Sequence, residues 1–284
     1  MKLGTYFSLI KPERTITNTI TAVAGYLFAS RWEIDLLEFT SLITGLTLII
    51  ASANVLNNYL DRGLDSKMAR TKNRALPSGR VSASGAIAYA VALGLAGFGI
   101  LAYTNWLTLA IIAMAYFSYV VVYGFAKRHT VHGTLIGTIP GSASLVAGYT
   151  AVTGRLDSAA LILFVIMLAW QMVHFYAIAT YRLRDYATAK IPVMPVKRGV
   201  ELTKRYMLAY LIIFIFAANL LTWEDYTGYI YLSAVGLLGL LWLRVVLRGF
   251  HVKNNEQWAR EVFKFSLVVL LVMSVSLAVG PILP

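Results

Sequence analysis

Long apolar blocks separated by short polar segments dominate the pattern of the chain. Each block is close to the roughly 20 residues that an α-helix needs to cross the hydrocarbon core of a bilayer. Every backbone polar group must be satisfied within the membrane, so such blocks are expected to be helical. The pattern predicts nine transmembrane helices, at about 15–30, 39–60, 83–103, 106–126, 134–151, 158–181, 205–222, 228–247 and 263–283.

The composition agrees with a membrane protein. Hydrophobic residues make up 58% of the 284 residues and charged residues only 13%, against about 25% charged residues in soluble domains. We therefore expect an all-α, polytopic membrane protein with a single intramembrane domain over residues 1–284. Its helices, about nine, are expected to surround a central cavity open to the cytoplasmic side. The chain has no cysteine, which excludes disulfides, thiolate metal sites and thiol nucleophiles.

The connecting segments alternate in charge. Only two of the 25 Lys and Arg residues, Arg31 and Arg155, lie in the set of segments 31–38, 104–105, 152–157 and 223–227. The positive-inside rule places the other, basic segments in the cytoplasm. This predicts a cytoplasmic N-terminus, an external C-terminus and an odd number of spans. The expected location is the cytoplasmic (inner) membrane of a bacterium. The net charge of +12 is then mainly a topology signal and indicates no nucleic-acid partner.

Two of the predicted cytoplasmic loops are long, at 61–82 and 182–204. Each follows a long apolar span, and four spans separate them. This arrangement suggests two related four-helix units followed by a final helix.

Three oxygen-bearing side chains recur at intervals of four residues near the end of the second span. Asn57, Asp61 and Asp65 would share one helix face, because each step of four residues turns a helix by only about 40° beyond a full turn. Polar residues at membrane depth are costly and usually functional. Mg²⁺ prefers oxygen ligands, typically one or two carboxylates with substrate phosphates and water. The spacing therefore predicts a magnesium site.

Basic side chains surround these candidate ligands. Those expected to bind substrate phosphates in the first long loop are Arg62, Lys67, Arg70, Lys72, Arg74 and Arg80. The second long loop also opens with a carboxylate among bases, and its candidates are Tyr181, Arg184, Asp185 and Lys190. Two such clusters facing one another would form a diphosphate clamp. The alternative interpretation is a solvated helix end with topology-setting charges.

Several segments resemble UbiA-type intramembrane prenyltransferases, and in particular the haem branch of that family, which farnesylates protohaem IX. The resemblance extends from about residue 6 to about residue 265. The segments that carry it are Lys11-Pro12, NNYLDRGLDSKMARTKNRALPSGRVS at 57–82, KRHTVHGTLIG at 127–137 and WQMVHFYAIATYRLRDYATAKIPVMPV at 170–196.

The resemblance implies Mg²⁺-dependent transfer of a farnesyl group from farnesyl diphosphate to a vinyl group of haem B, giving haem O. Carried over to this chain, the catalytic and Mg²⁺-binding residues are Asn57, Asp61, Asp65 and Asp185. The wider family usually has a second Asp where this chain has Ala189, and the haem branch also lacks it. At Val173 the family usually has Pro, so the local helix shape can differ.

Further residues are candidates for haem binding. They are Lys127, Arg128 and His129 in a short cytoplasmic loop, where they could meet the haem propionates, and His174 within the sixth span, where it could orient or ligate the iron. Histidines in loops are commonly solvated, and buried ones are commonly hydrogen-bonded within the bundle. The lipid bilayer is an expected partner, as is a haem A synthase or terminal oxidase that receives the product.

Two other functions are compatible with parts of the pattern. A sister prenyltransferase acting on an aromatic quinone precursor would share the Asn/Asp set, although Ala189 and the TKNR segment at 71–74 disfavour it. A transporter would need charged residues near the midplane of several spans. Here the candidate acidic ligands Asp61, Asp65 and Asp185 gather at one membrane face instead of the midplane, which disfavours transport.

Overall fold

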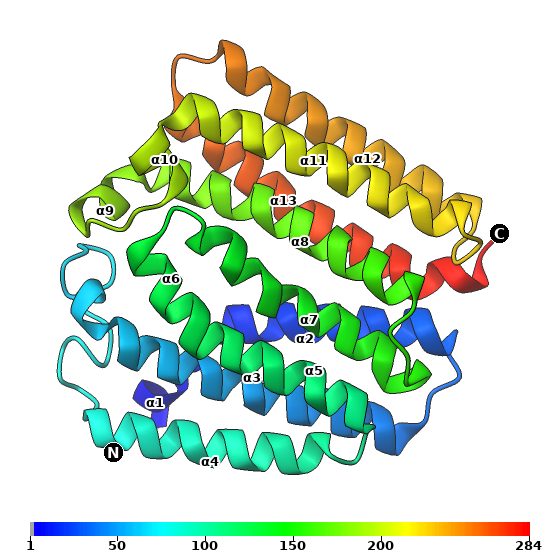
Figure 1. The fold of residues 1–284 in the computed structure, drawn as a ribbon, viewed down its shortest axis with the longest axis horizontal. Coiled ribbons are helices and arrows are strands. Elements are labelled where there is room, and N and C mark those ends of the chain that lie inside the picture. Colours follow the sequence, from blue (N-terminus) through cyan, green and yellow to red (C-terminus); the bar gives the residue numbers. More distant parts are fainter. Residues whose placement is uncertain (1–2) are drawn as a thin grey trace.

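The computed structural model describes residues 3–284, which form a bundle of antiparallel helices (Figure 1). The helices are α1 (Leu3–Leu9), α2 (Pro12–Ser30), α3 (Leu36–Asp65), α4 (Ala83–Leu101), α5 (Trp106–Phe117), α6 (Gly124–His129), α7 (Gly133–Thr153), α8 (Ser158–Tyr181), α9 (Leu183–Thr188), α10 (Met194–Arg198), α11 (Val200–Trp223), α12 (Tyr229–Arg248) and α13 (Asn255–Val279). A π-helical turn, Ser118–Tyr123, joins α5 to α6, and short 3₁₀ turns, Gly249–His251 and Gly280–Ile282, follow α12 and α13.

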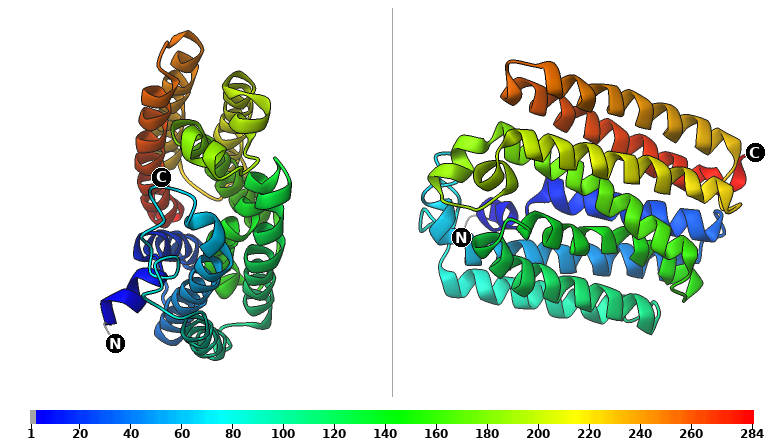
Figure 2. Two further views of the ribbon diagram at one scale, coloured as in Figure 1. Left: turned by 90° about the vertical axis from the view of Figure 1, so that its left-hand side faces the viewer. Right: turned by 45° about the horizontal axis from the view of Figure 1, so that its top comes forward.

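The all-α membrane fold is confirmed. Within residues 3–284, eight helical segments are long and apolar enough to cross a membrane, and α5, the π-turn and α6 together make one of them, Trp106–His129. They correspond to eight of the nine predicted spans. The first predicted span, 15–30, is α2, a helix of 19 residues whose threonine-rich first half makes it less apolar than the eight. It nevertheless lies among them and packs against α7 and α13 (Figure 2).

Close backbone contact joins α2 to α7. A Cβ atom at Gly148 of α7 would lie 2.7 Å from the backbone nitrogen of Tyr26 on α2, closer than real Cβ atoms approach other atoms. Transmembrane helices commonly associate through small residues that let their backbones approach. The glycine at this crossing therefore sets the distance between the two helices.

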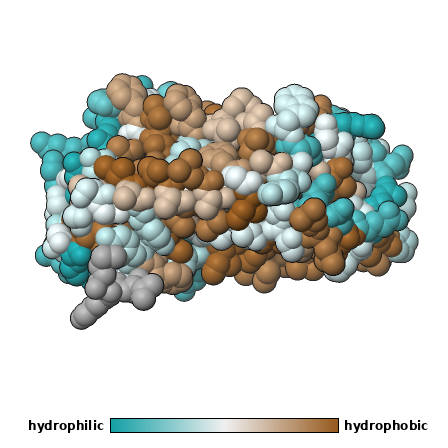
Figure 3. Space-filling model, turned by 90° about the horizontal axis from the view of Figure 1, so that it is seen from below, coloured by the Kyte–Doolittle hydropathy of each residue, from teal (hydrophilic) through white to brown (hydrophobic). Residues whose placement is uncertain are grey.

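Three polar side chains cap the N-termini of helices at the end of the bundle opposite α1. Asp35 accepts hydrogen bonds from the backbone of α3, Asn105 from that of α5, and Asp157 from that of α8. Such caps satisfy amide groups that have no partner within the helix. The described C-terminal residues lie at this same end (Figure 1), and a broad hydrophobic band separates the two hydrophilic ends on the face shown in Figure 3.

α3 is longer than a membrane crossing requires. Its 30 residues span about 45 Å at 1.5 Å per residue, whereas the hydrocarbon core is about 30 Å thick. The last turns of α3 can therefore stand at the level of the headgroups and the water. Those turns carry the predicted oxygen donors.

Candidate active site

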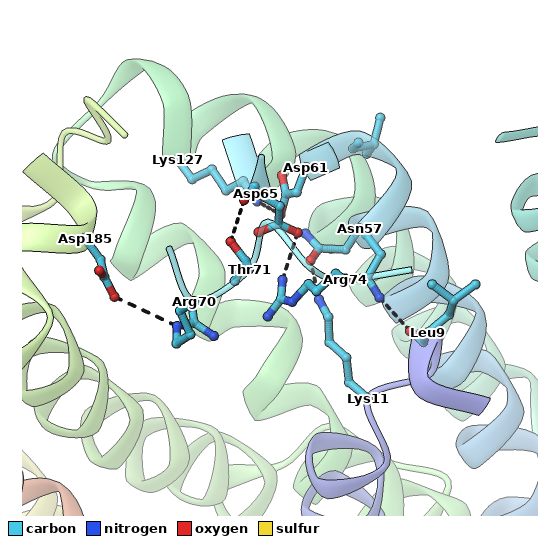
Figure 4. A network of polar contacts seen from close by, with 12 residues as sticks. Leu9, Lys11, Asn57, Asp61, Asp65, Arg70, Thr71, Arg74, Lys127 and Asp185 are labelled. Carbon is cyan, nitrogen blue, oxygen red and sulfur yellow. Dashed lines mark hydrogen bonds and ion pairs between the residues drawn. The ribbon is translucent and has the colours of Figure 1, made fainter. Parts of the chain in front are cut away.

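Asn57, Asp61 and Asp65 follow one another along the last turns of α3, as their spacing predicts (Figure 4). Asn57 and Asp65 are buried, and Asp61 is largely enclosed. The site lies at the end of the bundle that carries α1, α9 and the loop 66–82 (Figure 1). Polar groups from both long loops meet there, so the predicted clustering is observed for these donors.

Each oxygen donor of α3 is matched by a base. Arg74 Nη1 lies 2.8 Å from Asp65 Oδ2, and Lys11 Nζ donates to Asn57 Oδ1 at 2.7 Å. Asp61 pairs with Lys127, and Arg128 Nη2 lies 3.5 Å from its other oxygen. The charges of the two carboxylates are thus balanced by bases from two other segments, while Lys11 brings its donor to the neutral amide of Asn57.

Asp185 stands on α9, across from the donors of α3. Its Oδ2 lies 4.0 Å from Arg70 Nε, and both side chains are partly exposed. Arg70 comes from the loop that follows α3, so this contact joins the first long loop to the second (Figure 4). The structure therefore places Asp185 at the site through a basic residue of the opposing loop.

An apolar cluster packs the loop after α3 against the loop after α8. Met68 of the first loop packs with Ala189 and Ile191 of the second, and all three are buried. Ala189 occupies the position where the wider family usually has a second aspartate. A carboxylate there would be removed from water without a partner in this cluster, which is strongly unfavourable. The absence of an aspartate at 189 therefore agrees with how the loops pack.

A cavity of about 300 Å³ opens beside the donors, and four bases contribute to its lining: Lys11, Arg70, Arg74 and Arg80. Burial lowers the pKa of Lys11 well below its usual range, and the positive charges of Arg14 and Arg74 lower it further. Burial and the nearby Arg182 likewise lower the pKa of Arg70. Positive charges that are crowded and partly dehydrated favour an anion in this cavity.

Lys11 was not among the predicted substrate-binding residues, although it lies directly on Asn57. The available signal was its position immediately before Pro12, which begins α2 at the same end of the bundle. Arg14, one turn further, was also missed, and it lies near the hydroxyl groups of Tyr119, Tyr123 and Tyr186.

The other predicted bases are divided between the site and the surface. Arg80 lines the cavity and donates to Asn73 O at 2.6 Å. Arg62 instead folds back over the ring of Tyr59, 4.2 Å from its centroid. The following are exposed, and the structure brings none of them into contact with the donors of α3: Lys67, Lys72, Arg184 and Lys190.

Two further predicted residues contact aromatic or guanidinium groups outside the donor cluster. His129 is exposed and stacks on Phe125, with 4.2 Å between the ring centroids. Tyr181, at the end of α8, accepts a hydrogen bond from Arg182 Nε at 3.0 Å and lies beneath the guanidinium of Arg260. Neither side chain meets the oxygen donors directly.

His174 is buried in α8, and its hydrogen bonds define its tautomer. Its Nδ1 lies 2.7 Å from Ser266 Oγ on α13, and that hydroxyl donates its single proton to Phe263 O at 2.6 Å. The hydroxyl must therefore accept from His174 Nδ1–H. In the neutral imidazole, Nε2 then keeps its lone pair, which is the form that binds metals.

The π-turn directs a row of side chains towards the site. Tyr119 and Tyr123 stack with 5.6 Å between their centroids, and Lys127 Nζ lies 5.3 Å from the centroid of Tyr123. Tyr119 also donates to Asn54 Oδ1 on α3 at 3.4 Å. π-Turns inside helices occur frequently at functional sites. Here the turn aligns the rings of Tyr119 and Tyr123 with Lys127, the basic residue that pairs with Asp61.

The donor chemistry fits Mg²⁺. Within residues 3–284, no group of three or more His, Asp or Glu side chains converges as a preformed metal cage. The site instead offers the amide of Asn57 and three carboxylates next to a basic cavity. Mg²⁺ is usually held by one or two carboxylates together with substrate phosphates and water, so an incomplete protein cage beside an anion cavity is the expected arrangement.

Comparison with known proteins decides the family. A model of the UbiA prenyltransferase family matches residues 18–268. The chain belongs to the UbiA prenyltransferase family. Its curated relatives include the protohaem IX farnesyltransferase of Protochlamydia amoebophila, 44% identical over 96% of each chain. That of Serratia proteamaculans is 42% identical over 96% of this chain and 93% of its own length.

Several solved structures have the same fold. A digeranylgeranylglyceryl phosphate synthase superposes with a TM-score of 0.83 at 22% identity and covers 99% of both chains. A UbiA homologue from Archaeoglobus fulgidus bound to GPP and Mg²⁺ gives a TM-score of 0.75 at 12% identity, over 96% of this chain and 99% of that one. These structures show the fold, and membership of the family shows that the chain is a prenyltransferase.

Proposed function

We propose that this UbiA prenyltransferase transfers a farnesyl group from farnesyl diphosphate to a vinyl group of haem B, giving haem O and diphosphate. The observation that carries the proposal is the identity of 42–44% over nearly the whole chain to relatives named protohaem IX farnesyltransferase. The alternative acceptor, an aromatic quinone precursor, has no comparable support.

Asn57, Asp61, Asp65 and Asp185 would hold Mg²⁺ at the diphosphate. The homologue bound to GPP and Mg²⁺ supports a metal-dependent site of this class. When bound, the ion supplies positive charge that stabilises the departing diphosphate. The bases of the site supply the rest of that stabilisation.

The basic partners have a second role in this scheme. Arg74 and Lys127 neutralise Asp65 and Asp61 while the site lacks substrate, and Lys11 donates to Asn57. A diphosphate in the adjoining cavity would offer these bases phosphate oxygens in exchange, and charge-assisted bonds to phosphate are among the strongest in proteins. As the allylic C–O bond breaks, preorganised positive charges stabilise the charge that develops on the leaving group.

The tyrosines of the π-turn would face the prenyl group. Departure of diphosphate leaves positive charge on the farnesyl C1, and the faces of Tyr119 and Tyr123 carry the negative part of the ring quadrupole. The vinyl group attacks C1 to form a C–C bond, and water then adds to the resulting cation and releases a proton. Exclusion of water before that step keeps the farnesyl group from being hydrolysed.

His174 would hold the acceptor. Its Nδ1–H is committed to Ser266, so the lone pair of Nε2 remains to ligate the haem iron. Purified enzyme with added haem B should show a ligand-dependent shift of the Soret band that His174→Ala removes. The shift should remain in His132→Ala, which changes the loop histidine just before α7. If His132→Ala or His129→Ala removed the shift instead, the ligand would lie in the loop.

The orientation proposed is a cytoplasmic N-terminus and an external C-terminus in a bacterial inner membrane. It follows from the basic loops, which gather at the active-site end, and from the termini, which lie at opposite ends of the bundle (Figure 1). Farnesyl diphosphate would then enter from the cytoplasm. The product would pass to a haem A synthase or a terminal oxidase.

Substrate choice tests the proposal. Purified enzyme with Mg²⁺ and farnesyl diphosphate should convert haem B to haem O, detected by mass after haem extraction, and should not prenylate 4-hydroxybenzoate. Prenylated benzoate as the only product would refute the haem assignment while leaving the prenyltransferase family intact.

A further inference from the structure

A shallow, open groove of about 390 Å³ lies on the outer face of α12 and the 3₁₀ turn that follows it. It is near the same end of the bundle as the active site but on the far side of the molecule, away from α3 (Figure 1). Its lining consists of Leu240, Leu243, Arg244, Leu247, Arg248 and His251.

The lining of the groove becomes more basic towards the end of α12. Leu240 and Leu247 are 59% and 43% exposed, so this face of α12 points towards lipid. Arg244 lies one turn before the end of α12, Arg248 is its last residue, and His251 lies in the 3₁₀ turn that follows. A surface that is apolar at membrane depth and basic at the interface complements an amphiphile with an anionic head.

The arginines of the groove lack strong partners. Among residues 3–284, Arg244 has no hydrogen bond or ion pair, and Arg248 has only Glu261, at 3.7 Å and with both side chains well exposed. Arg244 also stands one turn, about 6 Å, closer to the membrane centre than Arg248. An unpaired guanidinium at that depth is costly, and snorkelling towards water relieves the cost only in part.

We propose that this groove binds an anionic phospholipid of the leaflet at the active-site end, which is the cytoplasmic leaflet in the proposed orientation. The phosphate would pair with Arg244 and Arg248, since guanidinium groups match phosphate oxygens in bidentate geometry. The acyl chains would lie along Leu240, Leu243 and Leu247. Basic pockets at the cytoplasmic side of membrane proteins commonly recognise such headgroups.

A free anion fits the groove less well than a lipid does. A phosphate ion would use only the basic residues and leave the leucines in contact with bulk lipid. A zwitterionic phospholipid carries a compensating positive charge beside its phosphate, which two arginines disfavour. The occupant is therefore expected to have both a net negative headgroup and acyl chains.

Lipid binding to the full-length protein in detergent tests the proposal. Native mass spectrometry and thermal unfolding would be recorded with dioleoylphosphatidylglycerol, dioleoylphosphatidylcholine or inorganic phosphate. Phosphatidylglycerol should remain bound and raise the Tm more than the other two. Arg244→Gln combined with Arg248→Gln should weaken its binding about tenfold or more, the loss expected from one charge-assisted contact.

The control variant combines Arg205→Gln and Lys264→Gln, which remove two exposed basic groups from α11 and α13, outside the groove. Its Kd for phosphatidylglycerol should lie within about twofold of that of the native protein, which is a much smaller change in binding free energy than a tenfold loss of affinity. The proposal is overturned if phosphatidylcholine or phosphate alone reproduces the effect, or if the two double variants behave alike. Equal Tm values without lipid establish that both variants fold.

Discussion

Replacement of Lys11 by Gln tests the assignment of this residue to the diphosphate. Its Nζ lies 2.7 Å from Asn57 Oδ1 and lines the basic cavity. A Gln amide can still donate to Asn57, so the variant removes the charge while preserving a donor. A hydrogen bond to a charged group contributes about 1.5–3 kcal/mol, and about 1.4 kcal/mol is a factor of ten in rate. We therefore expect kcat/KM for farnesyl diphosphate to fall about 10- to 150-fold.

The assay is the initial rate of prenyl transfer at saturating acceptor, with farnesyl diphosphate varied and Mg²⁺ fixed. Lys11→Arg should retain most of the activity because it keeps the charge, and Lys253→Gln, in the exposed loop before α13, should have no effect. The Tm of each variant shows whether the fold is intact. A Lys11→Gln enzyme with native kcat/KM would refute the role, and so would equal losses in Lys11→Gln and Lys11→Arg.

Three further outcomes are expected. Asp61→Asn should lower kcat by about 10³ or more, because a metal ligand contributes several kcal/mol, and near-normal turnover would contradict the magnesium assignment. Gly148→Ala should lower the Tm by several degrees because its Cβ would strike α2, whereas Gly99→Ala, which meets no atom within 4 Å, should not. A reporter in the loop 66–82 should read cytoplasmic and one fused at Pro284 external; the reverse result would invert the proposed orientation.

The main features of the fold could be predicted because they depend on local chemistry. Apolar length alone locates membrane helices, and a spacing of four residues alone places Asn57, Asp61 and Asp65 on one face. Both rules act within a single helix. They say nothing about which side chain from elsewhere meets that face.

The partners of the donors could not be predicted for that reason. Arg74 reaches Asp65 while Lys67 and Lys72 remain exposed, because the loop turns back after α3, where Thr71 Oγ1 donates to the Asp65 carbonyl at 2.8 Å. Lys11 is 46 residues from Asn57 in the chain. The π-turn was also missed, since 106–126 reads as an ordinary apolar helix.

α3 both crosses the membrane and carries the oxygen donors of the site. Inserting one residue upstream of Asn57 would rotate all the donors by about 100° and advance them about 1.5 Å, whereas four added residues would nearly restore their direction but advance them about 6 Å. Neither change preserves both the direction in which the donors point and their depth relative to the membrane. Upstream of the donors, insertions and deletions should therefore be tolerated only before the first residue of α3, Leu36, where a longer or shorter loop absorbs the difference.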